Sequence, residues 1–365
     1  MLVDDAAVVR HVIGGWLSEQ PDMQLVGALA GGREALECVE RLDPDLVILD
    51  VTMPDVDGLA VLPRLLEKKK NLIVLMVSAL TRRDAEISLR ALTLGAADYV
   101  PKPQADGELQ NAELFRLELF EKIRGLVARR KMVFPLAEPR GPARTPAPIV
   151  RGTEFDSSGS PTPLRRSVLP SPPRVLLIGA STGGPQALNA VLAAIGPAID
   201  KAPVLIAQHM PPTFTTVLAE HLARASGRPA AEAKHGEPVR AGRIYLAPGG
   251  FHMRVARRDG DAVIVLDDGP RINSCKPAVD ALFNSAAATW GQWNLGLVLT
   301  GMGSDGARGA AQLVAAGAHV IVQDESTSVV WGMPGSVAQA GLASAVLPLS
   351  QIGPRVLRLF AGDRL

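Results

Sequence analysis

Ten of the 29 prolines in this 365-residue chain lie between Phe134 and Arg174, with glycine and serine residues among them. A stretch of this composition builds neither a helix nor a sheet ladder and buries little apolar surface, so it predicts an extended, semi-rigid linker. We therefore expect a first domain over 1–132, a linker over 133–173 and a second domain over 174–365. At roughly 150 residues per domain, the chain is long enough for both.

The composition limits the class of protein. Hydrophobic residues make up 47% and charged residues 21%, which excludes a chain that is disordered throughout. A formal net charge of +1 argues against a general nucleic-acid or membrane-surface binder. Two cysteines cannot build a disulfide framework, and no apolar run approaches the roughly 20 residues that span a bilayer. The N-terminus lacks the pattern of a signal peptide, so the expected location is the cytoplasm.

Short apolar runs alternate with helical patterns on both sides of the linker. The expected strands are 46–49, 72–77, 98–100, 175–178, 204–208, 243–246, 295–299 and 319–323. The expected helices are 6–19, 33–42, 58–69, 81–94, 108–130, 185–195, 213–226, 277–290 and 306–316. This alternation predicts two α/β domains with mainly parallel sheets and helices on both faces, in which ligands bind at the carboxyl ends of the strands.

Acidic residues gather at the strand ends of the first domain. Asp4 and Asp5 follow a first short strand, Asp50 ends LVILD, Ser78 ends LIVLMVS and Lys102 follows DYV. Three carboxylates brought together repel one another unless a cation binds, and oxygen ligands alone suit Mg²⁺. A carboxylate beside Mg²⁺ and a lysine is a good phosphoryl acceptor, and the serine hydroxyl can then bind the added phosphoryl group.

The combination of DD, LDVTMPDVDG, VSA and PKP resembles a response-regulator receiver domain over nearly all of residues 1–130. The resemblance implies a flavodoxin-like α/β fold, Asp50 as phosphoacceptor and a sensor histidine kinase as phosphodonor. It implies a Mg²⁺ site made by Asp4, Asp5, Asp50 and the Thr52 backbone. It also implies the switch residues Ser78, Tyr99 and Lys102. Only Met1–Val3 precede Asp4, fewer residues than such domains usually carry, so we expect either a start further upstream or a weakened receiver.

The second domain opens with VLLIGASTGGPQALNAVL, a buried strand that runs into a glycine-rich turn and a helix begun by Pro185. Such a turn can cradle the pyrophosphate of a dinucleotide. The same turn, written G-x-S-x-G, can present Ser181 as a nucleophile. Each pattern alone is weak.

The next strand favours the nucleophile. A dinucleotide fold needs an acid at the end of its second strand, but VLIAQ ends at His209, and Asp200 precedes that strand. A histidine beside Ser181 can take the hydroxyl proton and return it to the leaving group. The acid that orients the histidine is either Asp305 or Asp324, since each follows a strand.

Other titratable residues have weaker claims. Asp280 lies at a helix start and is more simply a partner of the helix dipole. His252, in APGGFHM, is a candidate for the lining of the site. The cysteine and histidine spacings do not suit zinc.

The motifs IGASTGG, AQHMP, YLAPGGFHM, KPAVD, LTGMGSDGA and QDESTSVVWGMP run in order across residues 175–334. Together with the order receiver, linker and enzyme, they resemble the chemotaxis protein-glutamate methylesterase (CheB) family over nearly the whole chain. The resemblance implies a doubly wound methylesterase domain with Ser181 as nucleophile, His209 as base and Asp305 as the orienting acid. It also implies an oxyanion hole near Thr182 and Met302.

The implied reaction is hydrolysis of glutamate γ-methyl esters on methyl-accepting chemoreceptors, and also deamidation of receptor glutamines, without a cofactor for the ester chemistry. The resemblance further implies that the receiver covers the esterase until Asp50 is phosphorylated. No nucleic acid and no membrane insertion are expected. Two other classes remain: a phosphorylation-dependent binding module with an inactive esterase site, and a nucleotide-binding regulator that uses Gly179–Gly184.

Overall fold

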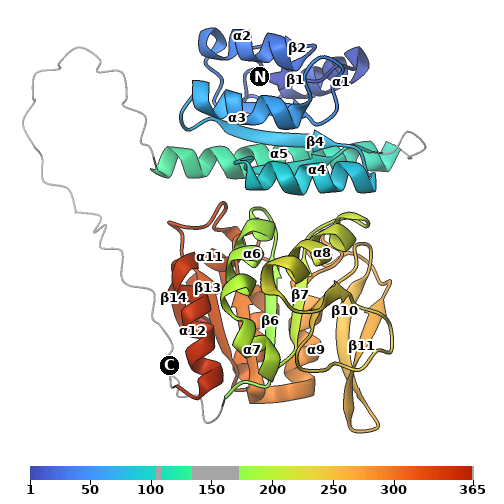
Figure 1. Cartoon of the computed structure of the whole chain (residues 1–365), viewed down its shortest axis with the longest axis vertical. Helices are drawn as coiled ribbons and strands as arrows, with labels where there is room; N and C mark the ends of the chain where they lie inside the picture. Colours follow the sequence, from blue (N-terminus) through green and yellow to red (C-terminus); the bar gives the residue numbers. More distant parts are fainter. Residues whose placement is uncertain (104–108, 134–171, 364–365) are drawn as a thin grey trace, which may run out of the picture.

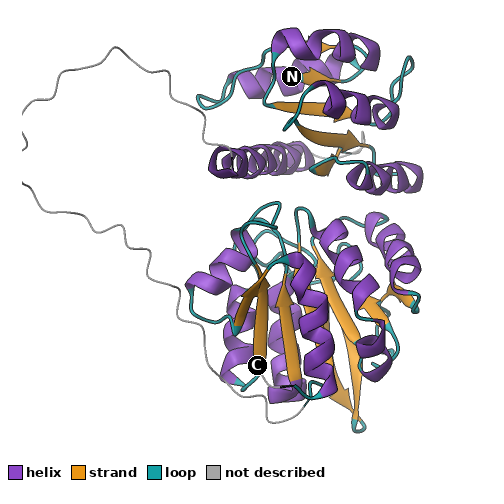
Figure 2. Cartoon of the chain, turned by 60° about the vertical axis from the view of Figure 1, so that its left-hand side comes forward, coloured by secondary structure: helices purple, strands orange, loops and turns teal. Residues whose placement is uncertain are grey.

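The computed structural model describes residues 1–103, 109–133 and 172–363, so most of the expected linker lies outside the described residues. The chain forms two α/β units, and the first lies against the loops at one end of the second unit's sheet (Figure 1). Strands and helices alternate in both units (Figure 2). Among the described helices, none is long and apolar enough to cross a membrane.

The first unit is a five-stranded sheet in the order β2-β1-β3-β4-β5, and all neighbouring strands are parallel. This is the flavodoxin-like order that the sequence predicted. Its strands are β1 (Leu2–Val3), β2 (Ala28–Leu29), β3 (Leu46–Asp50), β4 (Ile73–Ser78) and β5 (Asp98–Pro101). Its helices are α1 (Ala7–Ser18), α2 (Gly32–Leu42), α3 (Gly58–Lys68), α4 (Arg82–Thr93) and α5 (Leu109–Val133).

Two local features hold the acidic edge of this sheet. The two-residue strand β1 pairs with β2 on one side and β3 on the other, so the short start still forms a central strand. The loop after β3 returns so closely that a Cβ on Gly58 would lie 2.1 Å from the Asp50 carbonyl oxygen. Only glycine fits there. The preceding residue, Asp57, caps α3 by accepting the Ala60 N–H at 2.7 Å.

The second unit has a seven-stranded, all-parallel sheet in the order β14-β13-β12-β6-β7-β9-β8. Its strands are β6 (Val175–Ala180), β7 (Val204–Gln208), β8 (Ala230–Glu232), β9 (Ile244–Leu246), β12 (Asn294–Val298), β13 (His319–Gln323) and β14 (Ala345–Leu347). An antiparallel hairpin of β10 (His252–Arg258) and β11 (Asp261–Asp267) packs beside it. The helices are α6 (Gly184–Ala194), α7 (Gly196–Lys201), α8 (Phe214–Ser226), α9 (Val279–Trp290), α10 (Ala307–Ala315), α11 (Gly332–Gln339) and α12 (Leu349–Ala361), with a short 3₁₀ turn at Gly291–Trp293.

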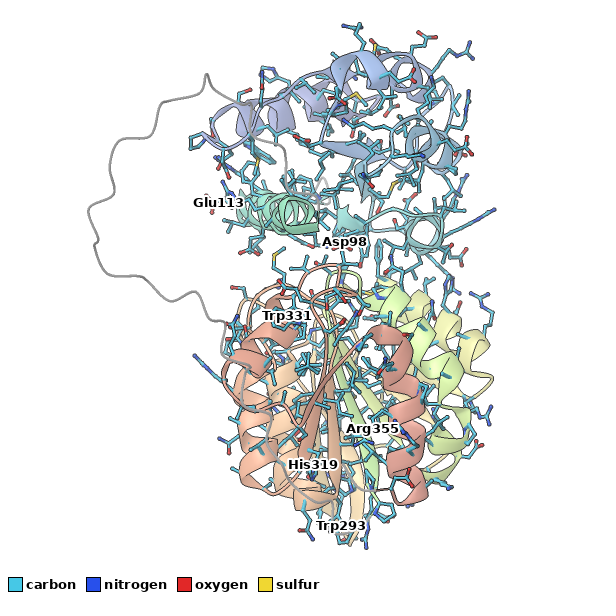
Figure 3. The ribbon with its side chains drawn as sticks, turned by 90° about the vertical axis from the view of Figure 1, so that its left-hand side faces the viewer. Asp98, Glu113, Trp293, His319, Trp331 and Arg355 are labelled. Atoms are coloured by element: carbon cyan, nitrogen blue, oxygen red, sulfur yellow. The ribbon has the colours of Figure 1, made fainter. Side chains whose placement is uncertain are left out.

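Strand β6 lies in the middle of the sheet, with β7 on one side and β12 on the other. The strands that follow β6 in the chain are added first on the β7 side and then on the β12 side. The carboxyl ends of β6, β7 and β12 therefore lie side by side at a topological switch point, where doubly wound folds bind their ligands. In Figure 3, Trp331 lies at this end of the sheet, toward the first unit, and His319 and Trp293 lie at the opposite end.

The first unit packs on the second through α4, β5 and α5. Tyr99 stacks on Phe214 with ring centroids 4.7 Å apart and planes 6° apart. Arg82 pairs with Glu220 at 2.6 Å. A Cβ on Gly125 of α5 would lie 2.6 Å from the Met302 methyl group, so this helix lies directly on the loop after β12.

Candidate active site

Ser181 lies on the turn between β6 and α6. Its N–H donates to Thr300 O at 3.1 Å, its carbonyl accepts the Gly184 N–H at 2.7 Å, and Gly183 adopts φ 74°. A Cβ at Gly184 would lie 2.0 Å from Gln208 Oε1, so a larger residue here would displace the Gln208 side chain. The result is the strand-turn-helix elbow that the G-x-S-x-G pattern predicted.

Gln208 joins the ends of β6 and β7. It is the last residue of β7, and its Nε2 donates to the carbonyls of Ser181 at 2.9 Å and His209 at 3.3 Å. The His209 N–H in turn donates to Ala180 O at 3.1 Å. Ser181 and His209 are therefore the first residues after the paired ends of β6 and β7, as the sequence predicted.

Asp305 holds His209. Its Oδ2 lies 2.7 Å from His209 Nε2, and the carboxylate is 2% exposed. Oδ2 also accepts the Val279 N–H at 2.6 Å. Burial alone would raise the pKa of Asp305, but the bond to His209 and the backbone N–H donors outweigh it and lower the pKa.

The rest of the support comes from Asp280 and Asn273. Oδ1 of Asp305 accepts from Asn273 Nδ2 at 3.0 Å, Asp280 N at 3.1 Å and Gly306 N at 3.0 Å. Asp280 Oδ1 accepts the N–H groups of Gly306 and Gly309 at the start of α10. Asp280 lies in the first turn of α9, but the helix N-terminus that its carboxylate binds is therefore that of α10. Burial raises the pKa of Asp280, and the nearby Asp305 carboxylate adds to the rise.

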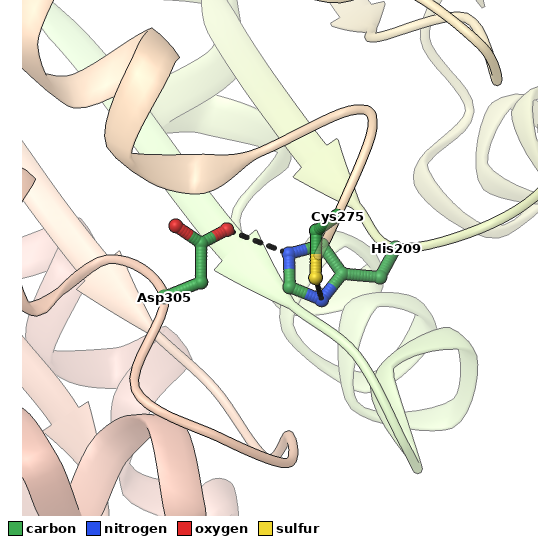
Figure 4. A group of neighbouring side chains, drawn as sticks. All are labelled: His209, Cys275 and Asp305. Carbon is green, nitrogen blue, oxygen red and sulfur yellow. Dashed lines mark hydrogen bonds and ion pairs between the residues drawn. The ribbon is translucent and has the colours of Figure 1, made fainter. Parts of the chain in front are cut away.

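Sequence reasoning missed Cys275. Its Sγ lies 3.3 Å from His209 Nδ1, on the side of the ring opposite Asp305 (Figure 4). Burial disfavours the charged imidazole, but contact with Cys275 and Asp305 outweighs it and raises the pKa of His209 to about 10. The Ser181 hydroxyl has no hydrogen-bond partner among the described residues. Cys275 lies 66 residues from His209 along the chain, and only the fold brings them together.

The two residues expected at the oxyanion hole flank the elbow. The backbone N–H groups of Thr182 and Met302 make no hydrogen bond within the described part of the chain. The Thr182 carbonyl accepts from Thr300 Oγ1 at 2.9 Å, which fixes the strand-end loops against each other. Two free backbone donors next to Ser181 are the kind of group that binds a developing oxyanion.

The other candidates have structural roles. Asp324 accepts from Ser326 Oγ at 2.7 Å and Thr327 N at 3.0 Å within its own loop, and no bond joins it to His209. His252 is fully buried rather than lining the site: its Nε2 lies 2.9 Å from Pro270 O and its Nδ1 accepts the Ala278 N–H at 3.2 Å. It thus supports both ends of the loop that carries Cys275.

The acidic cluster of the first unit assembles as expected. Oxygen atoms of Asp4, Asp5 and Asp50 lie within 4.8 Å of one another, with Asp4 and Asp50 buried and Asp5 exposed. Lys102 Nζ bridges Asp4 at 2.7 Å and Asp50 at 2.9 Å. Burial raises the pKa of Asp50 to about 6, although Lys102 opposes this rise. Buried carboxylates whose charge one lysine only partly offsets fit a hard divalent cation such as Mg²⁺.

Of the expected switch residues, Lys102 contacts this cluster directly, and Ser78 and Tyr99 lie on the neighbouring strands β4 and β5. The Ser78 hydroxyl accepts from Ser88 Oγ at 2.9 Å and is buried. Tyr99 is also buried, and its ring lies on Phe214 of the second unit. Thr52, whose backbone was expected at the Mg²⁺ site, is exposed, and its hydroxyl donates to Asp84 at 3.4 Å.

The fold and these two sites define a receiver domain joined to a hydrolase domain. Family models match in the same order: "Response regulator receiver domain" over 1–113 and "CheB methylesterase" over 176–356. The protein-glutamate methylesterase/protein-glutamine glutaminase of group 2 operon from Rhodopseudomonas palustris is 56% identical, covering 100% of this chain and 94% of that protein. A Nitrobacter hamburgensis protein-glutamate methylesterase/protein-glutamine glutaminase is also 56% identical over the same shares.

A solved structure gives the same result for the second unit. The CheB methylesterase catalytic domain of Thermotoga maritima is 39% identical, with a TM-score of 0.50, over 51% of this chain and 98% of that domain. The chain belongs to the CheB family of methylesterases, as its motifs indicated.

Proposed function

We propose that this chain hydrolyses glutamate γ-methyl esters on methyl-accepting chemoreceptors, and deamidates receptor glutamines, through Ser181, His209 and Asp305. The observation that supports this most is the 2.7 Å bond between Asp305 and His209 at the end of β7, beside the elbow that carries Ser181. The names of the relatives point to the same pair of reactions.

In the proposed reaction, Ser181 Oγ attacks the ester carbonyl and His209 takes its proton at Nδ1. Asp305 holds Nε2–H, stays ionised and stabilises the imidazolium. The N–H groups of Thr182 and Met302 bind the oxyanion. His209 then protonates the leaving methanol, or ammonia when the substrate is glutamine. Water releases the acyl group by the same steps in reverse.

Ser181 must first approach Nδ1, which contacts Cys275 in this structure. Catalytic hydrogen bonds often form only when substrate is bound, so a free serine hydroxyl is compatible with this role. The test is methanol release from methylated receptor. Ser181→Ala should abolish it, and the control Ser304→Ala, at an exposed serine beside Asp305, should not. Methanol release that persists in Ser181→Ala would overturn the assignment.

We further propose that a sensor histidine kinase supplies a phosphoryl group to Asp50 and that this controls the esterase. Asp4, Asp5, Asp50 and the Thr52 carbonyl would hold Mg²⁺, which when bound offsets the negative charge of the phosphoryl group. Lys102 already contacts two of these acids, and Ser78 ends the neighbouring strand, so both can contact the product. Asp50→Asn should block phosphorylation, whereas Asp57→Asn, at a helix cap in the same loop, should permit it.

The contact between the units supports inhibition by covering. Helix α5 lies on Met302, a proposed oxyanion donor, and Tyr99 lies on the first residue of α8, in the segment that follows His209. Phosphorylation would shift the population toward separated units. Residues 174–365 alone should then be more active than the unphosphorylated full chain. No gain on removal of the receiver would refute the covering. The cytoplasm is the location that we propose for this reaction.

A further inference from the structure

The thiol beside His209 has no part in the proposed esterase reaction. Asp305 occupies one ring nitrogen of His209, and Cys275 lies against the other (Figure 4). We propose that Cys275 is a thiol-exchange site, at which a low-molecular-weight disulfide forms a mixed disulfide that blocks the esterase. The block rests on the proposed function, whereas the exchange reaction does not.

The loop that carries Cys275 is held in one conformation. Ile272 and Cys275 exchange two backbone hydrogen bonds, of 3.1 and 2.9 Å, around a two-residue turn. Asn273 and Ser274 in this turn adopt φ 51° and 63°, the left-handed values of a type I′ turn. The Asn273 amide also donates to Asp305 at 3.0 Å, so the turn is bonded to the acid that orients the catalytic histidine.

His252 supports the same loop from below. Its Nδ1 accepts the Ala278 N–H, which leaves Nε2–H to donate to Pro270 O at 2.9 Å. These bonds lie on either side of Cys275 in the sequence. The thiol is therefore positioned by a buried framework, while its side chain stays partly exposed to solvent.

His209 gives the thiol a proton acceptor. The thiolate is the reactive form of cysteine, and a histidine at hydrogen-bond distance both takes the thiol proton and stabilises the anion. Asp305 on the far side of the ring stabilises the imidazolium that results. The order Cys275, His209, Asp305 thus repeats the logic of a nucleophile, its base and an orienting acid.

The other cysteine is an internal comparison. Cys38 in α2 is also partly exposed, and it contacts the Arg41 guanidinium at 3.3 Å. Arginine stays protonated and cannot accept the thiol proton. The two cysteines therefore share partial exposure, and they differ in the presence of a neighbouring base.

The exchange is a balanced reaction. Cys275 Sγ attacks one sulfur of the disulfide, a new S–S bond forms and the old S–S bond breaks. The departing thiolate carries the electron pair and takes the proton that His209 accepted. Cys275 is oxidised and the departing half of the disulfide is reduced to a thiol. A thiol reductant reverses each step.

The mixed disulfide would block the esterase by position. Nδ1 of His209 is the nitrogen that must receive the Ser181 proton, and Cys275 Sγ lies 3.3 Å from it. A group attached to this sulfur occupies the space between His209 and an incoming ester.

The test uses the full-length protein and glutathione disulfide, with peptide mass spectrometry to follow each cysteine. Because a histidine nitrogen lies beside Cys275 and only a guanidinium lies beside Cys38, Cys275 should react roughly ten times faster than Cys38. His209→Gln should remove this advantage and leave the Cys38 rate unchanged in the same sample.

Esterase activity is measured on the same samples. Treated wild type and treated Cys38→Ser should lose activity in proportion to the adduct at Cys275, and dithiothreitol should restore it. Treated Cys275→Ser should keep the activity that it had before treatment. Equal rates at the two cysteines, a Cys275 advantage that survives His209→Gln, or equal activity loss in Cys275→Ser would each overturn the proposal. Labelling rates need no esterase, so they stand even if Ser181→Ala refutes the proposed function.

Discussion

Replacing Asp305 by asparagine changes one atom of the most heavily bonded carboxylate in the site. The carboxylate accepts five hydrogen bonds, from His209 Nε2, Val279 N, Asn273 Nδ2, Asp280 N and Gly306 N. An amide has a single oxygen, so its NH₂ group must face some of these donors. The least unfavourable choice puts NH₂ at the Oδ2 position, where only His209 and Val279 lie, and keeps the other three bonds.

The magnitude follows from this arrangement. The Val279 N–H is left buried without an acceptor, which costs about 1 to 3 kcal/mol, and the three remaining bonds lose their charge. The domain should lose roughly 3 to 5 kcal/mol of unfolding free energy, the usual cost of breaking a buried charged pair. His209 must now accept at Nε2 and carry its proton on Nδ1. It can then no longer take the Ser181 proton, and activity should fall by roughly four orders of magnitude.

The assay combines methanol release with urea unfolding followed by tryptophan fluorescence, since Trp290, Trp293 and Trp331 report on the second domain. Activity is measured without urea, where the variant is folded, so the loss of activity is separate from the loss of unfolding free energy. Asp324→Asn is the matched control, because its bonds stay within its own loop. If Asp305→Asn keeps a tenth of the activity, or Asp324→Asn loses as much, the assignment of the orienting acid is wrong.

Three further predictions test the electrostatics and the domain contact. Cys275→Ala removes a contact that raises the pKa of His209, so the pH at which kcat/KM rises should move down. An unchanged profile would show that the thiol does not act on the imidazole. Burial raises the pKa of Asp50 to about 6, above its unfolded value, so its ionisation destabilises the fold as pH rises from about 4 to 6. Without Mg²⁺, Asp50→Asn should therefore stabilise the receiver by about 1 to 3 kcal/mol at pH 8 and by little at pH 4 in urea titrations, and equal differences at both pH values would contradict this. Arg82→Glu turns the exposed ion pair with Glu220 between the two units into a repulsion, so methanol release by the unphosphorylated full chain should rise several-fold, and activity at or below wild type would count against the covering.

Much of this architecture was predictable because strand ends carry the chemistry in parallel sheets. The strands before Asp50, Ser181 and His209 are continuous apolar runs, and their boundaries were right to within about two residues. Several short or polar elements were not predicted, and neither were the helices α7, α11 and α12. Strands β2, β8 and β14 have two or three residues, and the hairpin of β10 and β11 carries arginines and aspartates on a partly exposed face.

The site shows the same limit. A histidine after the second strand can be found by spacing, but Cys275 belongs to a loop between a hairpin and a helix. Neither its distance from His209 nor the turn that holds it follows from local pattern. For His252 the error runs the other way. Its place near a glycine-rich loop made it a candidate for the lining of the site, but the fold buries it against the loop that carries Cys275. Long-range hydrogen bonds decide both cases, and no local periodicity encodes them.

These contacts give the two sites a physical connection. A phosphoryl group on Asp50 would compete for Lys102, which now bridges two carboxylates, and for the Ser78 hydroxyl, which now bonds Ser88. Ser78 pairs with Pro101 in the strand that carries Tyr99, and Tyr99 stacks on Phe214. Phe214 is five residues beyond His209, so a change in the packing of this ring would act on the segment that holds the proposed catalytic histidine. The receiver would then control both the access to the esterase and the position of its base, which covering alone would not achieve.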